Sequence, residues 1–314
     1  MAEQRTVGIV GTGHVGMAAA YAIFQQGAAR RIILTDRDRS RAQGEAMDLM
    51  HGQAYVGHCD VIAGDYADLA QAQVIIVAAG VAQRPGESRL ALLGRNATVF
   101  AEIARALDRH APGAVLLVAS NPVDLLTYIL QTLSRRPHRR VIGTGTMLDT
   151  TRFRSLLSDH YGCDPRSVHA FILGEHGDTE VPVWSSAQIA GTRLQGNTVL
   201  GRPWDWPAMQ DLFEQVRGAA GSVIDRKGYT NWAIGLVLAH LVRTIQADQR
   251  SLLPVSVRLE GEYGLGQVCL SVPTAVGREG VGQRLPPHLA ADERAALRAS
   301  GQGLRASLAE LDYG

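Results

Sequence analysis

Two short segments of the chain carry the residue types that acid–base chemistry on a small carboxylic acid needs. GEHGD at residues 174–178 contains His176, and MLDTTRFR at residues 147–154 contains Asp149 and Arg152. An imidazole can give or take a proton near neutral pH. A carboxylate can orient that imidazole, and a guanidinium fork can bind a substrate carboxylate. With a dinucleotide fingerprint near the N-terminus, these residues indicate hydride transfer to a small 2-keto acid.

Each of these features also has an ordinary structural explanation. Asp149 and Arg152 are three residues apart at the start of a predicted helix, where an ion pair contributes only about 0.2–0.5 kcal/mol. A single loop histidine such as His176 is usually a surface residue. Asn121-Pro122 is a good helix start, and QRPGESR at residues 83–89 fits a surface loop.

The dinucleotide fingerprint is GTGHVG at residues 11–16, between a predicted strand and an alanine-rich helix. Gly11 permits a tight turn, Gly13 lets the backbone approach a pyrophosphate, and Gly16 lets the helix pack closely on the strand. The helix N-terminus favours the anion. Asp36, at the end of the second predicted strand, can accept hydrogen bonds from both ribose hydroxyls.

We therefore predict NAD as the cofactor, because Asp36 would repel the 2′-phosphate of NADP. Two alternatives stay open from the residues alone. Asp36 could be a turn or cap residue, and Arg37 and Arg39 leave NADP binding open.

Short apolar runs alternate with helical patterns through the first half of the chain. Val/Ile/Leu-rich runs without alternation are typical of strands covered on both faces, and βαβ units predict a doubly wound parallel sheet of the Rossmann type. The predicted strands are Thr6–Val10, Arg31–Thr35, Asp60–Ala63, Gln73–Ala79, Ala114–Ala119 and Val141–Gly143.

The second half has a different pattern and predicts an α+β substrate domain. We expect a helix from about Thr146, a strand at Val168–Leu173, and helix from Trp206 to Asp248 with a break near Lys227-Gly228. Leu253–Leu259 and Gln267–Val272 flank a turn and predict a hairpin. A final helix is expected over Ala290–Leu311, packed back on the first domain. We place the domains at residues 1–145 and 146–314.

The composition is that of an ordinary globular protein. Of 314 residues, 46% are hydrophobic, and the net charge of +1 gives no strong attraction to nucleic acid or anionic membranes. Cys59, Cys163 and Cys269 lack metal-ligand spacing, so we expect no metal and free thiols in a reducing cytoplasm. We also expect no signal peptide and no membrane helix.

Taken together, the motifs resemble those of the lactate/malate dehydrogenase family over nearly the whole chain. They occur in the family's order: GTGHVG, GDYADL, PGESRLALLGRN, SNPVDLLTY, GTGTMLDTTRFR, GEHGDTEVPVWSS and KGYTNWAIG. The resemblance implies reversible hydride transfer between NADH and a 2-keto acid such as pyruvate.

The resemblance also implies a role for each matching residue. His176 exchanges the proton, Asp149 orients His176, Arg152 holds the substrate carboxylate, and Arg89 polarises the keto oxygen as the loop at residues 82–92 closes. Asn121, Asp124 and Thr230 are implied at the substrate, with Asn121 also at the nicotinamide. Further cofactor contacts are implied at Val15, Arg41, Tyr66, Gly80, Val81 and Ile234.

The same resemblance implies that Gln83 determines which keto acid is favoured. Lactate-specific relatives carry glutamine at this position and malate-specific relatives carry arginine. A neutral amide cannot balance the second carboxylate of oxaloacetate, and an unpaired buried charge costs several kcal/mol. Arg84 is adjacent, and a one-residue change of loop path would place it inward instead.

The resemblance extends to assembly and regulation. Arg154 and His169 match positions where bacterial lactate dehydrogenases bind fructose 1,6-bisphosphate between subunits. A structural anion site or plain surface charge is the alternative for these two residues. Few residues precede the first strand, so we expect a bacterial-type homotetramer. The alternative functions are a malate or other 2-hydroxy-acid dehydrogenase, an NAD-dependent glycosidase, and a non-catalytic NAD-binding protein.

Overall fold

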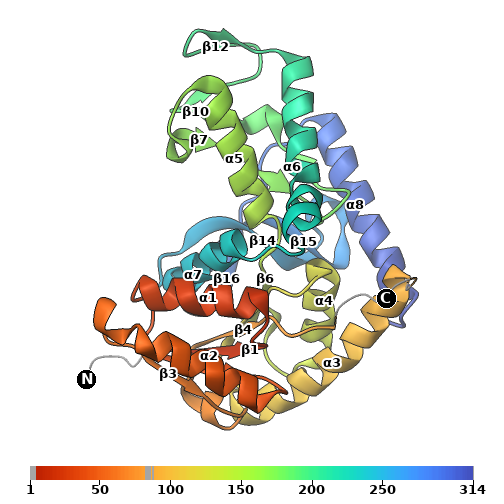
Figure 1. Ribbon diagram of the computed structural model, residues 1–314. Helices are drawn as coiled ribbons and strands as arrows, with labels where there is room; N and C mark the ends of the chain where they lie inside the picture. Colours follow the sequence, from red (N-terminus) through yellow and green to blue (C-terminus); the bar gives the residue numbers. More distant parts are fainter. Residues whose placement is uncertain (1–4, 82–85, 87, 314) are drawn as a thin grey trace.

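A nine-stranded sheet forms the centre of the molecule within residues 5–81, 86 and 88–313, which the computed structural model describes (Figure 1). Six strands are parallel, in the spatial order β3-β2-β1-β4-β5-β6. They are β1 Thr6–Val10, β2 Arg31–Thr35, β3 Asp60–Ala63, β4 Val74–Val77, β5 Val115–Val118 and β6 Val141–Gly143. All six predicted strands are confirmed, β4 and β5 being shorter at both ends. β1, β4 and β5 are buried throughout, which explains their continuous apolar sequences.

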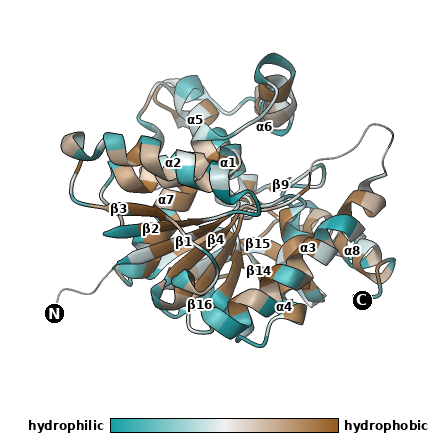
Figure 2. Ribbon diagram, turned by 60° about the horizontal axis from the view of Figure 1, so that its bottom comes forward, coloured by the Kyte–Doolittle hydropathy of each residue, from teal (hydrophilic) through white to brown (hydrophobic). Residues whose placement is uncertain are grey.

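Helices cover both faces of this sheet, and the apolar residues of the strands lie between them (Figure 2). On one face lie α1 His14–Gln25, α2 Arg39–His51 and α7 Trp232–Gln246; on the other lie α3 Arg89–His110 and α4 Val123–Leu133. α1 and α7 touch at Gly235, where an added Cβ would lie 2.7 Å from the backbone of Ala18. This close contact joins the nucleotide-binding helix to the second half of the chain.

Three antiparallel strands from the second half extend the sheet beyond β6: β14 Ser251–Glu260, β15 Gly266–Gly277 and β16 Gly280–Arg284. β14 pairs with β6 at Ser256 and Gly143. The predicted hairpin is confirmed as β14 and β15, although both strands are longer than predicted. The predicted final helix is confirmed as α8 Ala291–Ala309, which packs on β15 and also contacts α4. The sheet is therefore continuous across the change of sequence pattern near residue 145.

A second lobe with its own apolar core contains α5 Met147–Tyr161 and α6 Trp206–Lys227. Gly228, at φ +86°, ends α6 where the break was predicted. Short strands complete the lobe: β7 Val168–His169, β8 Ile172–Leu173, β9 Val181–Pro182, β10 Gln188–Ile189, β11 Thr192–Arg193, β12 Thr198–Val199 and β13 Arg202–Pro203. The 3₁₀ turns of the chain are Gln53–Tyr55, Asp68–Gln71, His138–Arg140, Pro165–Ser167, Trp184–Ser186 and Glu262–Gly264.

The single strand predicted at Val168–Leu173 is wrong, because two strands occupy this segment. β7 pairs with β10, whereas β8 pairs with β9 and continues into a bridge between Gly174 and Ser271 of β15. Each half of the apolar run therefore finds a different partner. This arrangement anchors the start of GEHGD on the central sheet.

None of the helices in the described part of the chain combines the length and apolarity required to span a membrane.

Candidate active site

The turn after β1 has the shape that a dinucleotide requires. A Cβ on Gly11, which has φ +102°, would lie 2.6 Å from the amide nitrogen of Ala79, and a Cβ on Gly16 would lie 1.9 Å from the carbonyl oxygen of Gly11. Gly13 by contrast has no heavy atom within 4 Å of its Cβ position. The first and third glycines thus permit tight backbone packing, and the second leaves open space where a pyrophosphate could approach the N-terminus of α1.

Asp36 closes this turn from the end of β2. Its Oδ2 accepts hydrogen bonds from the amide of Thr12 at 2.6 Å and the hydroxyl of Thr12 at 2.9 Å, and its Oδ1 accepts from the amide of Asp38 at 3.0 Å. Burial opposes ionisation, but these hydrogen bonds outweigh it and lower the pKa of Asp36 below its ordinary value. Asp36 is therefore an anion at neutral pH, beside the position where the ribose of NAD would bind.

Of the other residues expected at the cofactor, Tyr66 and Arg41 lie near Asp36. The charge of Arg41 helps to lower the pKa of Asp36, and burial, with the charges of Glu102 and Asp36, raises the pKa of Tyr66. Arg41 Nε also lies 3.9 Å from Glu45 Oε1.

The remaining expected cofactor residues follow β4 or lie on α1 and α7. The amide of Val81 donates to Asn96 Oδ1 at 3.0 Å, and a Cβ on Gly80 would lie 3.0 Å from the same oxygen. Asn96 on α3 therefore fixes the segment after β4. Val15 on α1 and Ile234 on α7 are partly buried against the main core.

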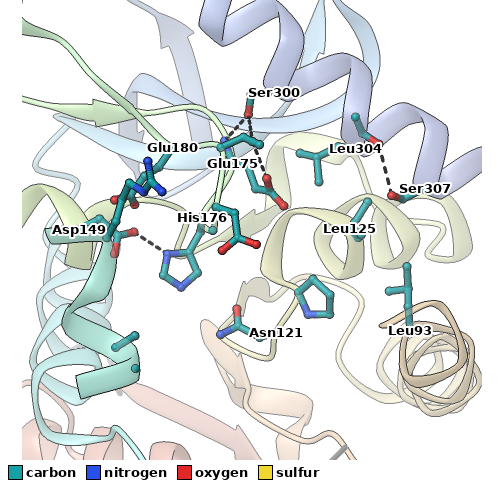
Figure 3. A pocket seen from close by; sticks show the side chains of 18 of the residues that line it. Leu93, Asn121, Leu125, Asp149, Glu175, His176, Glu180, Ser300, Leu304 and Ser307 are labelled. Carbon is teal, nitrogen blue, oxygen red and sulfur yellow. Dashed lines mark hydrogen bonds and ion pairs between the residues drawn. The ribbon is translucent and has the colours of Figure 1, made fainter. Parts of the chain in front are cut away.

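His176 and Asp149 form a hydrogen-bonded pair, as Figure 3 shows. His176 Nδ1 lies 2.5 Å from Asp149 Oδ2, and the Asp149 side chain is only 3% exposed. Asp149 lies in the first turn of α5, and His176 follows β8. Its imidazole remains 23% exposed, so its other ring nitrogen can exchange a proton with a molecule in the adjoining cavity.

Arg152 completes this group from the same helix. Its Nη1 donates to Asp149 Oδ1 at 2.9 Å, and its side chain is 19% exposed. Asp149 therefore bonds His176 through one oxygen and Arg152 through the other. The predicted helical ion pair and the predicted His–Asp pair exist together, and Arg152 keeps other N–H groups that can bind an anion.

Behind His176 lies Asp124, which is 2% exposed. Its Oδ2 accepts from the amide of His176 at 2.8 Å, and its Oδ1 accepts from the hydroxyl of Ser256 at 2.5 Å. Burial raises the pKa of Asp124 to about 6, although both hydrogen bonds oppose the shift. Asp124 is not among the described residues that line the cavity. We therefore propose that Asp124 positions the loop that carries His176 rather than contacting the substrate directly.

The surrounding charges favour the protonated form of His176. Burial alone would lower the pKa, but the hydrogen bond and charge of Asp149 outweigh it, with smaller contributions from Asp124 and Glu180. Together they raise the pKa of His176 to about 9. His176 can therefore hold a proton for donation at neutral pH.

The group opens onto a cavity of about 980 Å³ whose walls come from both halves of the chain. Among the described residues that line it are Asn121 and Leu125 beside α4, His176 and Asp149, and Arg217 on α6. Figure 3 shows Asn121 on the opposite side of the cavity from Asp149. The cavity therefore brings hydrogen-bonding groups from both halves of the chain to one space.

Not every expected substrate residue can be placed in the cavity. Gln83 and Arg84 lie outside the described residues, and so does the side chain of Arg89, whose backbone begins α3. Thr230 is partly exposed in the turn between α6 and α7 and is not among the described lining residues. Beside Thr230, the ring of Tyr229 stacks on His14 of the nucleotide-binding turn, with centroids 3.7 Å apart.

Sequence reasoning missed Ser256 and Glu180. Ser256 holds Asp124 from β14, a strand that follows it by 132 residues, so no local signal marks it. Glu180 lies in the segment GEHGDTEV and lines the cavity at 7% exposure. It could have been noticed as a carboxylate close in sequence to His176, although only the fold shows that it is buried.

Arg154 on α5 is linked to the segment that contains His169 on β7. Arg154 Nε donates to the carbonyl oxygen of Ala170 at 2.9 Å, and its guanidinium lies over the ring of Phe171 at 5.1 Å. His169, the residue before Ala170, is exposed. Arg154 does not take part in the ion pair between Arg152 and Asp149.

Family models identify both halves of the chain. The model of the lactate/malate dehydrogenase NAD binding domain matches residues 5–143, and that of the alpha/beta C-terminal domain matches residues 146–312. The chain belongs to the lactate/malate dehydrogenase family. It is accordingly an NAD-dependent dehydrogenase, and the expected fold class is confirmed.

Relatives in the lactate/malate dehydrogenase family are similar to this chain over their full length. The L-lactate dehydrogenase of Salinibacter ruber is 59% identical over 100% of both chains, and that of Thermus aquaticus is 46% identical over 98% of this chain and 99% of the relative. The crystal structure of a minor L-lactate dehydrogenase from Enterococcus mundtii superposes with a TM-score of 0.95 at 38% identity, covering 98% of each chain.

Proposed function

We propose that the protein is an L-lactate dehydrogenase that interconverts pyruvate and L-lactate. The observation that carries this proposal is the array His176–Asp149–Arg152, in which a proton donor and an anion-binding guanidinium share one buried carboxylate. The names of the full-length relatives, L-lactate dehydrogenase, support the same substrate.

In this proposal Arg152 binds the substrate carboxylate through a pair of N–H groups. His176 then faces the 2-position oxygen: it donates its proton when pyruvate is reduced and accepts one when lactate is oxidised. Asp149 keeps the imidazole oriented through Nδ1 and stabilises its cation. Arg89, Asn121, Gln83 and Thr230 retain the substrate roles that the resemblance implies.

The nucleotide turn fits NAD, because Gly13 leaves room for the pyrophosphate and Asp36 presents an ionised acceptor for the ribose. Bound NADH supplies the hydride. Asn121, which lines the cavity, follows the carboxyl end of β5, and the nucleotide turn follows the carboxyl end of β1 in the same parallel sheet.

The preference for pyruvate is tested by comparing it with oxaloacetate as oxidant of NADH. We expect kcat/KM for pyruvate to be about 10³-fold higher, because a second carboxylate would enter a closed site without a cation to balance it. Equal values, or faster reduction of oxaloacetate, would identify a malate dehydrogenase and place Arg84 rather than Gln83 toward the substrate.

Full activity after treatment with a metal chelator would exclude a metal-requiring glycosidase.

We also propose activation by fructose 1,6-bisphosphate and assembly as a homotetramer. The support is that Arg154 donates a hydrogen bond to the carbonyl oxygen of Ala170, the residue that follows the exposed His169. Because the bisphosphate would bridge subunits, it would favour the arrangement with higher pyruvate affinity.

The free thiols of Cys59, Cys163 and Cys269 support a reducing, cytoplasmic location.

The expected result is a severalfold lower KM for pyruvate when fructose 1,6-bisphosphate is added, with a larger sedimentation coefficient at low protein concentration. His169→Gln should weaken the response and leave the unactivated rate unchanged, because His169 is exposed outside the cavity. No change in KM with added bisphosphate would disprove this regulation and leave Arg154 as a structural residue that holds Ala170.

A further inference from the structure

Glu180 is a buried carboxyl group in the wall of the cavity. It lies between His176 and β9, and its backbone amide donates to the carbonyl oxygen of Gly177 at 3.2 Å. The residue is 7% exposed, and its Oε1 is a buried atom without a hydrogen-bond partner within the described residues. Figure 3 shows Glu180 beside Asp149, on the same side of the cavity. An unpartnered buried oxygen is costly unless a ligand or a proton compensates it.

Charged groups face Glu180 from every element packed around it. Asp149 and Arg152 come from α5, His176 comes from the same loop, and Arg217 comes from α6. Burial and the charge of Asp149 raise the pKa of Glu180 to about 8, although His176, Arg152 and Arg217 oppose the shift. The protonated form of Glu180 is therefore more accessible near neutral pH than that of an exposed glutamate.

A substrate carboxylate would change this balance. Arg152 is already paired with Asp149, so an entering anion adds a second negative charge to one guanidinium. An ionised Glu180 would add a third negative charge to the same buried space, where like charges repel strongly. A neutral carboxyl group removes that repulsion and can also donate a hydrogen bond.

We propose that Glu180 is a positioning residue that takes up a proton when the substrate carboxylate enters, so that the cavity keeps its charge balance around Arg152. The proposal rests on the proposed function, because it assumes that a small 2-keto carboxylate is the anion. The proton moves from solvent to one carboxylate oxygen of Glu180, and it returns to solvent when the product leaves. Glu180 thereby sets the pH range of substrate binding without taking part in the bond changes.

Difference infrared spectroscopy tests this directly. Oxamate, a non-reacting analogue of pyruvate, is added to the enzyme–NADH complex at pH 8.5, and the carbonyl-stretching region of protonated carboxylic acids is recorded. We expect a new positive band, shifted by ²H₂O, in the wild-type enzyme and in the control E279Q, whose side chain is 65% exposed and paired with Arg140. The band should be missing in E180Q.

Two outcomes would overturn the role of Glu180: no band in the wild-type enzyme, or an undiminished band in E180Q. A purely structural role predicts either of these. E180Q should also bind oxamate within about threefold of wild type at pH 6.5, because glutamine copies the neutral form. A much weaker affinity at that pH in a folded variant would contradict the proposal. The wild-type measurement alone remains decisive if E180Q does not fold.

Failure of this inference is distinct from failure of the proposed function. If the wild-type enzyme reduces pyruvate and binds oxamate but shows no new infrared band, the proposed function stands and protonation of Glu180 is excluded. Wild-type enzyme that neither reduces pyruvate nor binds oxamate would overturn both.

Discussion

Replacing His176 with asparagine is expected to lower kcat/KM for pyruvate by about two to four orders of magnitude, the usual contribution of a general acid. The asparagine amide can still donate a hydrogen bond to Asp149, but it has no proton to transfer at neutral pH. Affinity for NADH should stay close to wild type, because His176 is held by Asp149 and Asp124, whereas the nucleotide turn is held by Asp36. Steady-state kinetics and NADH fluorescence titration measure the two effects.

The matched control for this variant is His58→Asn, because the His58 side chain is 71% exposed and lies at the edge of the sheet. It should retain full activity. A His176→Asn enzyme with more than a tenth of wild-type activity would show that another group donates the proton. The proposed function would then need a different acid in the cavity.

The same residue predicts the pH dependence of the two directions. The pKa of His176 is raised to about 9, so the protonated form dominates below this pH and is lost as pH rises through it. Pyruvate reduction needs that proton, and lactate oxidation needs the neutral imidazole. We therefore expect kcat for reduction at saturating substrate to fall, and kcat for oxidation at saturating substrate to rise, as pH increases through about 9, because Glu180 stays protonated while substrate is bound. The same direction of change in both profiles would contradict the assignment.

Arg152→Lys is expected to raise the KM for pyruvate by about 10- to 160-fold, with a smaller effect on NADH binding. Lysine keeps the charge but cannot present two parallel N–H groups to a carboxylate while bonding Asp149. The loss corresponds to roughly one charge-assisted hydrogen bond of about 1.5–3 kcal/mol, at about 1.36 kcal/mol per tenfold change. Pyruvate kinetics at saturating NADH measure it.

The control for this substitution is Arg166→Lys. Arg166 also makes a two-pronged pair, with Asp164, but its side chain is 90% exposed, so its loss should leave the KM unchanged. If Arg152→Lys binds pyruvate as wild type does, a different residue holds the substrate carboxylate. The ion pair between Arg152 and Asp149 would then serve stability alone.

Local sequence was sufficient for the elements of the first half and for naming candidates for the reacting groups. The strands of the parallel sheet are continuous apolar runs because helices cover both faces, and this pattern is readable without tertiary contacts. The turn at Gly11, Gly13 and Gly16 is equally readable, because the backbone leaves no room for a Cβ at Gly11 and Gly16 and leaves open space at Gly13. His176, Asp149 and Arg152 could be named as candidates from their residue types and motifs.

Contacts between distant segments decided the rest. Two antiparallel partners, β9 and β10, divide the apolar run that was predicted as one strand at Val168–Leu173. Asp124 and Ser256, from α4 and β14, meet beneath His176 because β14 joins the sheet next to β6. Glu180 lies in a polar segment, and only the packing of α5 and α6 around its loop removes it from water. Burial and electrostatic environment depend on such contacts, so tertiary structure alone determines how these side chains are charged.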